Sequence, residues 1–131
     1  MSTKSYRKKK RLRKKADKLW YEVNLMKEPN CVVCGKPANQ VHHFYGKGAY
    51  GHLRYDLDNG ISICQGCHFK HHTKADAAIH LAIIDKKGEE WLNRLKKKAN
   101  NRPESSYKTI GYYENQVDKL KKKKEDLKTN F

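Results

Sequence analysis

Long apolar segments are missing from this chain of 131 residues. No run of residues approaches the roughly 20 apolar positions that a membrane-spanning helix needs. The basic N-terminus is also not followed by a hydrophobic segment of the kind that marks a secretory signal. We therefore expect a protein that spans no membrane and stays in the cytoplasm, where a reducing environment favours metal binding over disulfide formation for paired cysteines.

Apolar and acidic residues are both scarce. Hydrophobic residues make up 37% of the chain and charged residues 34%, so the core of the single domain expected at this length is thin. Lys and Arg number 30 against 14 Asp and Glu, which leaves a net charge of +16. An excess that is clustered in this way favours a polyanionic partner, most often nucleic acid. The alternative is a basic protein with solvated charge runs.

The composition divides the chain into three segments. Residues 1–28 form a basic arm that is expected to become helical toward Trp20 and Leu25. Such an arm either folds along a phosphate backbone or serves as a solubilising tail. Residues 29–99 are expected to form the folded domain, and residues 100–131 a linker followed by a basic helix.

Hydrophobic periodicity predicts the elements within these segments. Residues 31–67 suit two short strands with long connections. After Cys67 an Ala-rich helix is expected that breaks near Gly88, followed by a second helix around Trp91. The last segment has four apolar residues at the spacing of a coiled-coil seam: Tyr113, Val117, Leu120 and Leu127. This seam either pairs with a second copy of the chain to form a homodimer or packs back on the domain.

All four cysteines fall into two C-x-x-C pairs, Cys31 with Cys34 and Cys64 with Cys67. Two such pairs can complete a tetrahedral zinc site, which would supply the stability that a thin core lacks. Disulfides are the alternative. A closed site of four cysteines leaves no open position for a substrate, so we expect this zinc to be structural.

Six of the seven histidines lie between residues 40 and 72. Neighbouring residues of a strand point to opposite faces, so His42 and His43 are expected to serve different tasks. Residues i and i+4 of a helix share a face, so His68 and His72 are expected to converge with His42 on one ion. His71 is an alternative to His72. Two histidines have no place in this arrangement and are expected on the surface: His52 and His80.

The order C-x2-C, His-His, Asn, C-x2-C-His-x3-His over residues 31 to 72 resembles the HNH nucleases with a ββα-metal fold. The resemblance implies that His42, His68 and His72 hold a catalytic divalent ion. It also implies that His43 is the general base and that Asn59 ties its loop to the strand and orients His43. We expect Mg²⁺ or Mn²⁺ as the catalytic ion, with Ni²⁺ and Zn²⁺ also compatible with imidazole ligands.

Longer stretches are similar to the phage NinG (Rap) recombination proteins. The segments that carry this likeness are ADKLWYEVNLMKEPNCVVCG, GAYGHLRYDLDN, IDKKGEEWLNRL and GYYENQVDKLKKKKEDL. The resemblance implies cleavage of branched DNA, such as Holliday junctions and D-loops, by a phage-encoded protein in the cytoplasm of a bacterial host. Basic segments on opposite sides of the domain are expected to hold more than one duplex, and a dimer would place two sites on a two-fold junction.

We therefore expect a small α+β domain of the ββα-metal type, stapled by a four-cysteine zinc site, with basic helical extensions at both ends. The expected function is that of a metal-dependent HNH endonuclease acting on branched DNA. The alternatives are a nicking or homing-type HNH endonuclease and a non-catalytic zinc DNA-binding adaptor. The residues expected to bind DNA are Arg7, Lys8, Lys9, Lys10, Arg11, Arg13, Lys14, Lys15 and Arg54.

Overall fold

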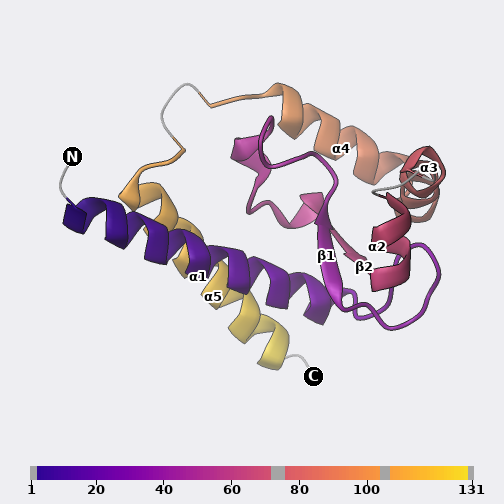
Figure 1. The fold of residues 1–131 in the computed structure, drawn as a ribbon, viewed down its shortest axis with the longest axis horizontal. Helices are drawn as coiled ribbons and strands as arrows, with labels where there is room; N and C mark the ends of the chain where they lie inside the picture. The colour runs from indigo at the N-terminus through magenta and orange to yellow at the C-terminus, as the bar shows by residue number, and fades with distance from the viewer. Residues whose placement is uncertain (1–2, 72–75, 104–106, 130–131) are drawn as a thin grey trace.

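A computed structural model describes residues 3–71, 76–103 and 107–129. It is a small α+β structure with a two-stranded antiparallel sheet, as the sequence predicted (Figure 1). Its elements are α1 (Thr3–Lys27), β1 (Gln40–His43), η1 (Gly51–Leu53), η2 (Leu57–Asn59), β2 (Gly60–Ile63), α2 (Gln65–His71), α3 (Asp76–Lys87), α4 (Glu89–Asn100) and α5 (Ile110–Thr129). Among the described residues, no helix is both long and apolar enough to cross a lipid bilayer.

The N-terminal segment is helical from Thr3, much earlier than the expected onset near Trp20. Lys and Arg are good helix formers, and a buried stripe anchors the helix: Ala16, Leu19, Trp20 and Val23. These residues follow the i, i+3, i+4, i+7 spacing of one helix face. The arm is thus an integral part of the fold.

Helix α5 packs along α1, and both helices run in the same direction (Figure 1). Lys8 of α1 lies 4.0 Å from Glu114 of α5, and Glu22 further along α1 pairs with Lys124. The predicted seam packs back on its own chain, because Tyr113, Val117 and Leu120 are buried in one cluster with the α1 stripe. The seam therefore gives no support to the predicted homodimer. The expectation that the two basic segments lie on opposite sides of the domain was wrong.

The two strands and the helix that follows them form the second half of the structure. Strands β1 and β2 pair antiparallel with Gln40 opposite Ile63 and His43 opposite Gly60. Strand β2 is buried along its whole length. It packs in a cluster with the helices that follow: Ile61, Ile63, Ile79, Ile83, Trp91 and Leu95. The predicted break is confirmed at Gly88, whose φ of 94° separates α3 from α4.

Helix α1 packs closely against strand β2 at Gly60. A Cβ atom at Gly60 would overlap the side-chain amide of Asn24. Asn24 is only 3% exposed, and its Nδ2 donates to the carbonyl of Trp20 at 2.9 Å. The absence of a side chain at residue 60 therefore lets α1 approach β2, and this approach positions Trp20.

The variant Gly60→Ala is expected to destabilise the protein by about 1–3 kcal/mol, because the added methyl group overpacks the contact with Asn24. Denaturant midpoints measured by circular dichroism would report this loss. Gly111→Ala is the matched control, since a Cβ at Gly111 meets no atom within 4 Å and Ala is a better helix former than Gly. Equal stability of both variants would contradict the tight seating of α1.

Candidate metal centre and histidine site

The structure brings all four cysteines together. The sulfur atoms of Cys31, Cys34, Cys64 and Cys67 all lie within 4.8 Å of one another, and the Sγ atoms of Cys34 and Cys64 are 3.6 Å apart. In a tetrahedral site with Zn–S bonds of about 2.3 Å, the sulfur atoms lie roughly 3.8 Å apart. The four thiols therefore fit a metal ion such as zinc. All four are free cysteines, so the disulfide alternative is not what the structure shows.

Local backbone geometry builds this cluster. Gly35 adopts a φ of 80° and its N–H donates to the carbonyl of Cys31 at 2.9 Å, which closes the first turn. In the second pair the N–H of Cys67 donates to Sγ of Cys64 at 3.4 Å. This bond is the main cause that lowers the pKa of Cys64 to about 7, and burial raises the pKa of Cys67 to about 12. The lowered pKa favours the thiolate form of Cys64, which is the form that binds a metal ion.

The histidines of β1 divide their tasks as alternating strand residues do. The ring of His42 lies 5.6 Å from the ring of His68 on α2, measured between centroids. His68 Nδ1 bonds to Oε1 of Gln40. Because an amide oxygen only accepts, Nδ1 carries the proton and the lone pair of the ring lies on Nε2. This is the arrangement in which an outer partner orients an imidazole ligand.

The third expected ligand cannot be placed with these two. His72 lies outside the described residues, and so does the side chain of His71. The choice between them stays a prediction, as does a catalytic ion at His42 and His68. Two imidazoles that bind one ion through metal–nitrogen bonds of about 2.1 Å must lie close together. The spacing of 5.6 Å between the ring centroids of His42 and His68 is compatible with such a site.

His43 has different neighbours and is held on two sides. Its ring stacks on the indole of Trp20 with centroids 4.0 Å apart and planes within 9°. Its Nε2 lies 3.0 Å from the carbonyl oxygen of Arg54, so Nε2 is the donor and Nδ1 has the lone pair. Burial lowers the pKa of His43 below the ordinary value of 6.5, against the opposing effect of the Arg54 carbonyl. His43 is therefore neutral at neutral pH, which is the form that a general base needs.

Asn59 ties the loop to the strand through its side chain. It is completely buried, and its Oδ1 accepts the N–H of Tyr45 at 2.8 Å. Its Nδ2 donates to the carbonyls of Tyr45 at 3.1 Å and Leu53 at 3.2 Å. Leu53 precedes Arg54, whose carbonyl holds His43. The contacts of Asn59 therefore fix the backbone next to that carbonyl, and its role in orienting His43 stays a prediction.

One groove of about 520 Å³ brings these side chains together. It is lined by Asp17, Trp20, Tyr21, Val41, His42, His43, Gly46, Lys47 and His68. Three of these residues come from α1, which sequence reasoning treated as a DNA-binding arm. Their i, i+3, i+4 spacing places them on one helix face. No local pattern shows what that face covers, so the sequence offered no signal for their presence in the groove.

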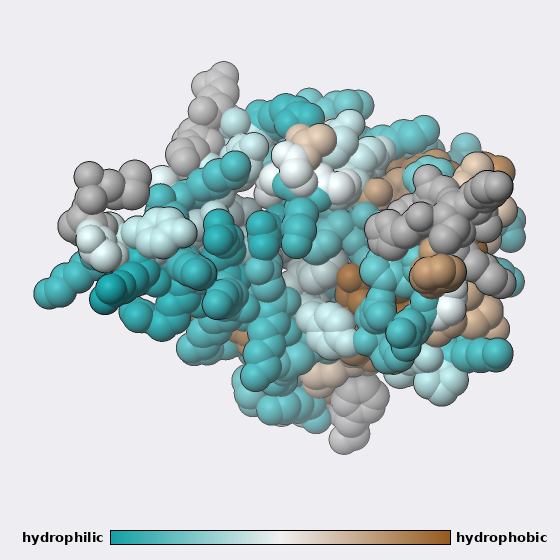
Figure 2. Space-filling view, viewed as in Figure 1, coloured by the Kyte–Doolittle hydropathy of each residue, from teal (hydrophilic) through white to brown (hydrophobic). Residues whose placement is uncertain are grey.

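The basic residues of α1 form an exposed face (Figure 2). Four of the expected DNA-binding residues line one shallow depression: Arg7, Lys10, Arg11 and Lys14. Arg54 differs from the others because its guanidinium donates to both carboxylate oxygens of Asp17, at 2.9 and 2.7 Å. Arg54 thus joins the loop to α1, and the hydrogen bonds with Asp17 raise the pKa of the Arg54 guanidinium. Its predicted role in DNA binding stays a prediction.

Two histidines that we expected on the surface are partly buried. His52 Nε2 lies 3.2 Å from the carbonyl oxygen of Lys98 and 3.1 Å from that of Ala99, which fastens η1 to the end of α4. His80 stacks on Phe44 with centroids 4.6 Å apart. Each side chain stays partly exposed, and each ring also contacts a segment that is distant in sequence.

Comparisons of the chain with protein-family models, with curated proteins and with solved structures found no match. The function is therefore argued from the geometry of the groove and its surroundings.

Proposed function

We propose that this protein is a metal-dependent endonuclease of the HNH type that hydrolyses phosphodiester bonds in DNA. The observation that carries the proposal is the position of His43, a neutral imidazole fixed by Trp20 and the Arg54 carbonyl, in the same groove as the close pair His42 and His68. A partly buried base beside two imidazoles that could ligate a metal ion supports phosphodiester hydrolysis.

The residues of the groove would divide the chemistry as follows. His42 and His68, together with His72, would hold the divalent ion. When bound, such an ion withdraws charge from the phosphate and stabilises the leaving oxygen. His43 would accept through Nδ1 the proton of a water molecule that attacks the phosphorus atom. The Arg54 carbonyl then stabilises the imidazolium through the opposite nitrogen, as a fixed partner does in general-base catalysis.

The basic face of α1 supports DNA as the substrate. Ten of the fifteen residues from Lys4 to Lys18 are Lys or Arg, and α5 adds a second row of lysines alongside. A phosphate backbone binds such a surface without sequence preference and with strong salt dependence. Six phosphate contacts would give a slope of about −5 in a plot of log K against log salt. A preference for branched DNA is part of the proposal, and it rests on the resemblance to the NinG-like proteins.

The test is cleavage of a four-way junction, a linear duplex of the same sequence and a supercoiled plasmid. Each is incubated with Mg²⁺, Mn²⁺, Ni²⁺ or Zn²⁺ and without added ion. We expect cleavage only with an added divalent ion and faster cleavage of the junction than of the duplex. His42→Ala should abolish cleavage at unchanged DNA affinity, while His80→Ala, which removes an imidazole outside the groove, should not.

Other outcomes identify the alternatives. Cleavage at one defined base sequence would indicate a site-specific HNH nuclease of the nicking or homing type, and equal cleavage of junction and duplex would indicate a general HNH nuclease. DNA binding without cleavage under every ion would contradict the endonuclease and indicate a zinc-stabilised DNA-binding adaptor.

A further inference from the structure

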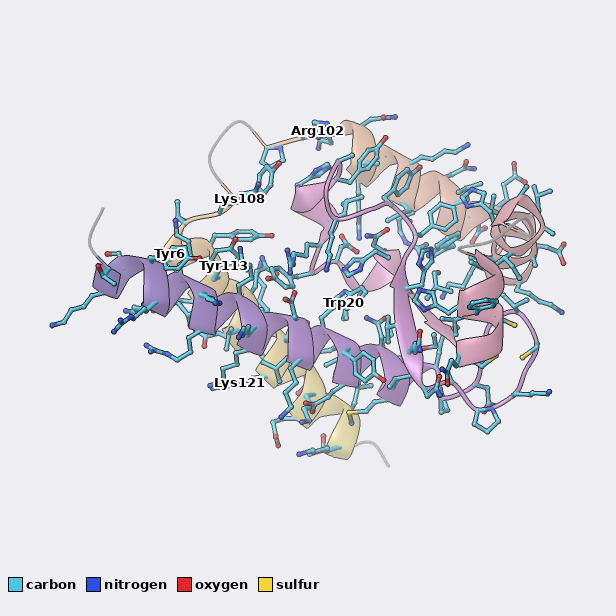
Figure 3. The ribbon with its side chains drawn as sticks, viewed as in Figure 1. Tyr6, Trp20, Arg102, Lys108, Tyr113 and Lys121 are labelled. Carbon is cyan, nitrogen blue, oxygen red and sulfur yellow. The ribbon has the colours of Figure 1, made fainter. Side chains whose placement is uncertain are left out.

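A second cavity lies next to the histidine groove, between α1 and the start of α5. It measures about 100 Å³, and Lys47 lines both spaces. Its wall comes from three distant parts of the chain: Arg13 on α1, the segment 47–55 and the segment 107–113. Figure 3 shows Lys108 and Tyr113 near the start of α5, above α1.

The wall of this cavity is cationic. Four of its lining residues are Arg or Lys and none is acidic: Arg13, Lys47, Arg54 and Lys108. Arg54 is paired with Asp17, whose carboxylate lies 2.7 Å from its guanidinium. The first turn of α5 contains no acidic residue either. A concave surface that is lined by basic and not by acidic side chains raises the local concentration of anions.

Tyrosines form the rest of the wall and offer neutral hydrogen-bond donors. Tyr107 and Tyr112 meet edge to face with ring centroids 6.4 Å apart. The Tyr107 ring also packs against Gly51, because a Cβ atom there would lie 2.8 Å from its Cε2. Burial raises the pKa of Tyr112, so its hydroxyl stays protonated and can donate to an anion. The rings are thus held in place before any ligand binds.

The dimensions restrict the ligand to one compact anionic group. Pockets for small molecules and cofactors measure about 300–1,000 Å³, so a cavity of about 100 Å³ is too small for a nucleobase with its sugar. A phosphate group is compact and accepts several charge-assisted hydrogen bonds at once, which Arg, Lys and phenolic hydroxyls can donate together. Lys47 connects this position to the groove in which the proposed cleavage occurs.

We propose that this cavity binds one phosphate group of the DNA strand whose neighbouring phosphodiester lies in the histidine groove. The inference rests on the proposed function and adds a second phosphate site to it. The path of the strand then runs from His43 past Lys47 to Arg13, Tyr107 and Lys108. Such a site holds a strand in register with the catalytic groove without reading its bases.

The test couples a change in the protein to a change in the DNA. Binding of a short single strand is measured without added divalent ion, so that the DNA stays intact. Each phosphate in turn is replaced by an uncharged methylphosphonate. We expect one position at which the replacement weakens binding to the unaltered protein about tenfold, while the same replacement has little effect on the Lys108→Gln variant. Lys108→Gln should also reduce the salt slope by about 1.

Two further variants keep this test specific. Tyr107→Phe removes a hydrogen-bond donor without changing the charge. In this variant, the methylphosphonate at the same position should weaken DNA binding less than it does in the unaltered protein. Lys86→Gln makes the same charge change on an exposed residue of α3, and it should leave the position-specific effect intact. If every methylphosphonate weakens DNA binding to the unaltered protein and to Lys108→Gln by the same factor, Lys108 acts only through general charge. The inference is then wrong.

Inorganic phosphate distinguishes a strand from a free anion. Its titration, followed by the NMR signals of the Tyr107 and Tyr112 rings, should show Lys108-dependent binding that the single strand displaces. Phosphate binding together with no coupled position in the strand would overturn the inference in favour of a small-anion site. Coupling at Lys108 without cleavage under any ion would overturn the proposed endonuclease alone, and cleavage without coupling would overturn this inference alone.

Discussion

His43→Ala is expected to lower the rate of DNA cleavage by about 10² to 10⁴, the usual loss when a general base is removed. The reason is geometric: the Arg54 carbonyl fixes Nε2 as the donor at 3.0 Å and leaves Nδ1 as the acceptor. Single-turnover cleavage at saturating protein measures this loss without a contribution from binding. DNA affinity and the content of one zinc per chain should stay the same, because His43 is not expected to ligate metal.

A separate variant changes the ring that stacks on His43 and leaves the imidazole itself in place. Trp20→Phe keeps an aromatic ring beside His43 but removes the indole N–H, which donates to the carbonyl of Asp56 at 3.0 Å. It should therefore retain far more activity than His43→Ala. Wild-type rates in a folded His43→Ala protein would contradict the assignment of the base and direct attention to another residue of the groove.

Loss of the cysteine site should unfold the domain that carries the histidines. A structural zinc site contributes about 10–16 kcal/mol of apparent binding free energy at pH 7, which matches or exceeds the stability of typical domains, about 5–15 kcal/mol. Cys31→Ser is therefore expected to abolish the cooperative thermal transition. Strong chelation of the unaltered protein should do the same, and circular dichroism with metal analysis would measure both effects.

The position of the cysteines allows ligation to be separated from packing. Cys31 is 3% exposed and belongs to the core cluster, whereas Cys34 is exposed. Cys34→Ser should therefore be nearly as damaging as Cys31→Ser if the four sulfurs bind zinc. Cys34→His supplies another zinc ligand and should restore much of the stability. Unfolding by Cys31→Ser alone would attribute the effect to the core and contradict the zinc site.

The predictions for His43→Ala and Cys31→Ser concern neighbouring parts of the same domain. Cys31 and Cys67 belong to the same core cluster as Ile61 and Ile63 of β2. Strand β2 pairs with β1, which carries His42 and His43, and α2 carries both Cys67 and His68. Removal of the cluster should thus eliminate cleavage by unfolding, while removal of His43 should slow cleavage with the fold intact. The comparison of the two variants separates support from chemistry.

Short-range spacing determined much of this protein. The C-x-x-C pairs, the adjacent histidines of a strand and the break at Gly88 are all local patterns, and bond geometry converts each into a defined turn, alternation or helix end. The four-cysteine cluster and the two-stranded sheet could therefore be predicted from the sequence. The roles of His43, Asn59 and the expected catalytic ion follow from the resemblance and stay predictions.

The tertiary structure decided what each helix face covers. Trp20 reaches the carbonyl of Asp56 across 36 residues, and Arg54 reaches Asp17 across 37. Periodicity shows that a helix has an apolar face but not which partner buries it, so it could not show that α1 forms a wall of the histidine groove. For the same reason the ring contacts of His52 and His80, and the parallel packing of α1 on α5, depend on distant segments that only the folded chain brings together.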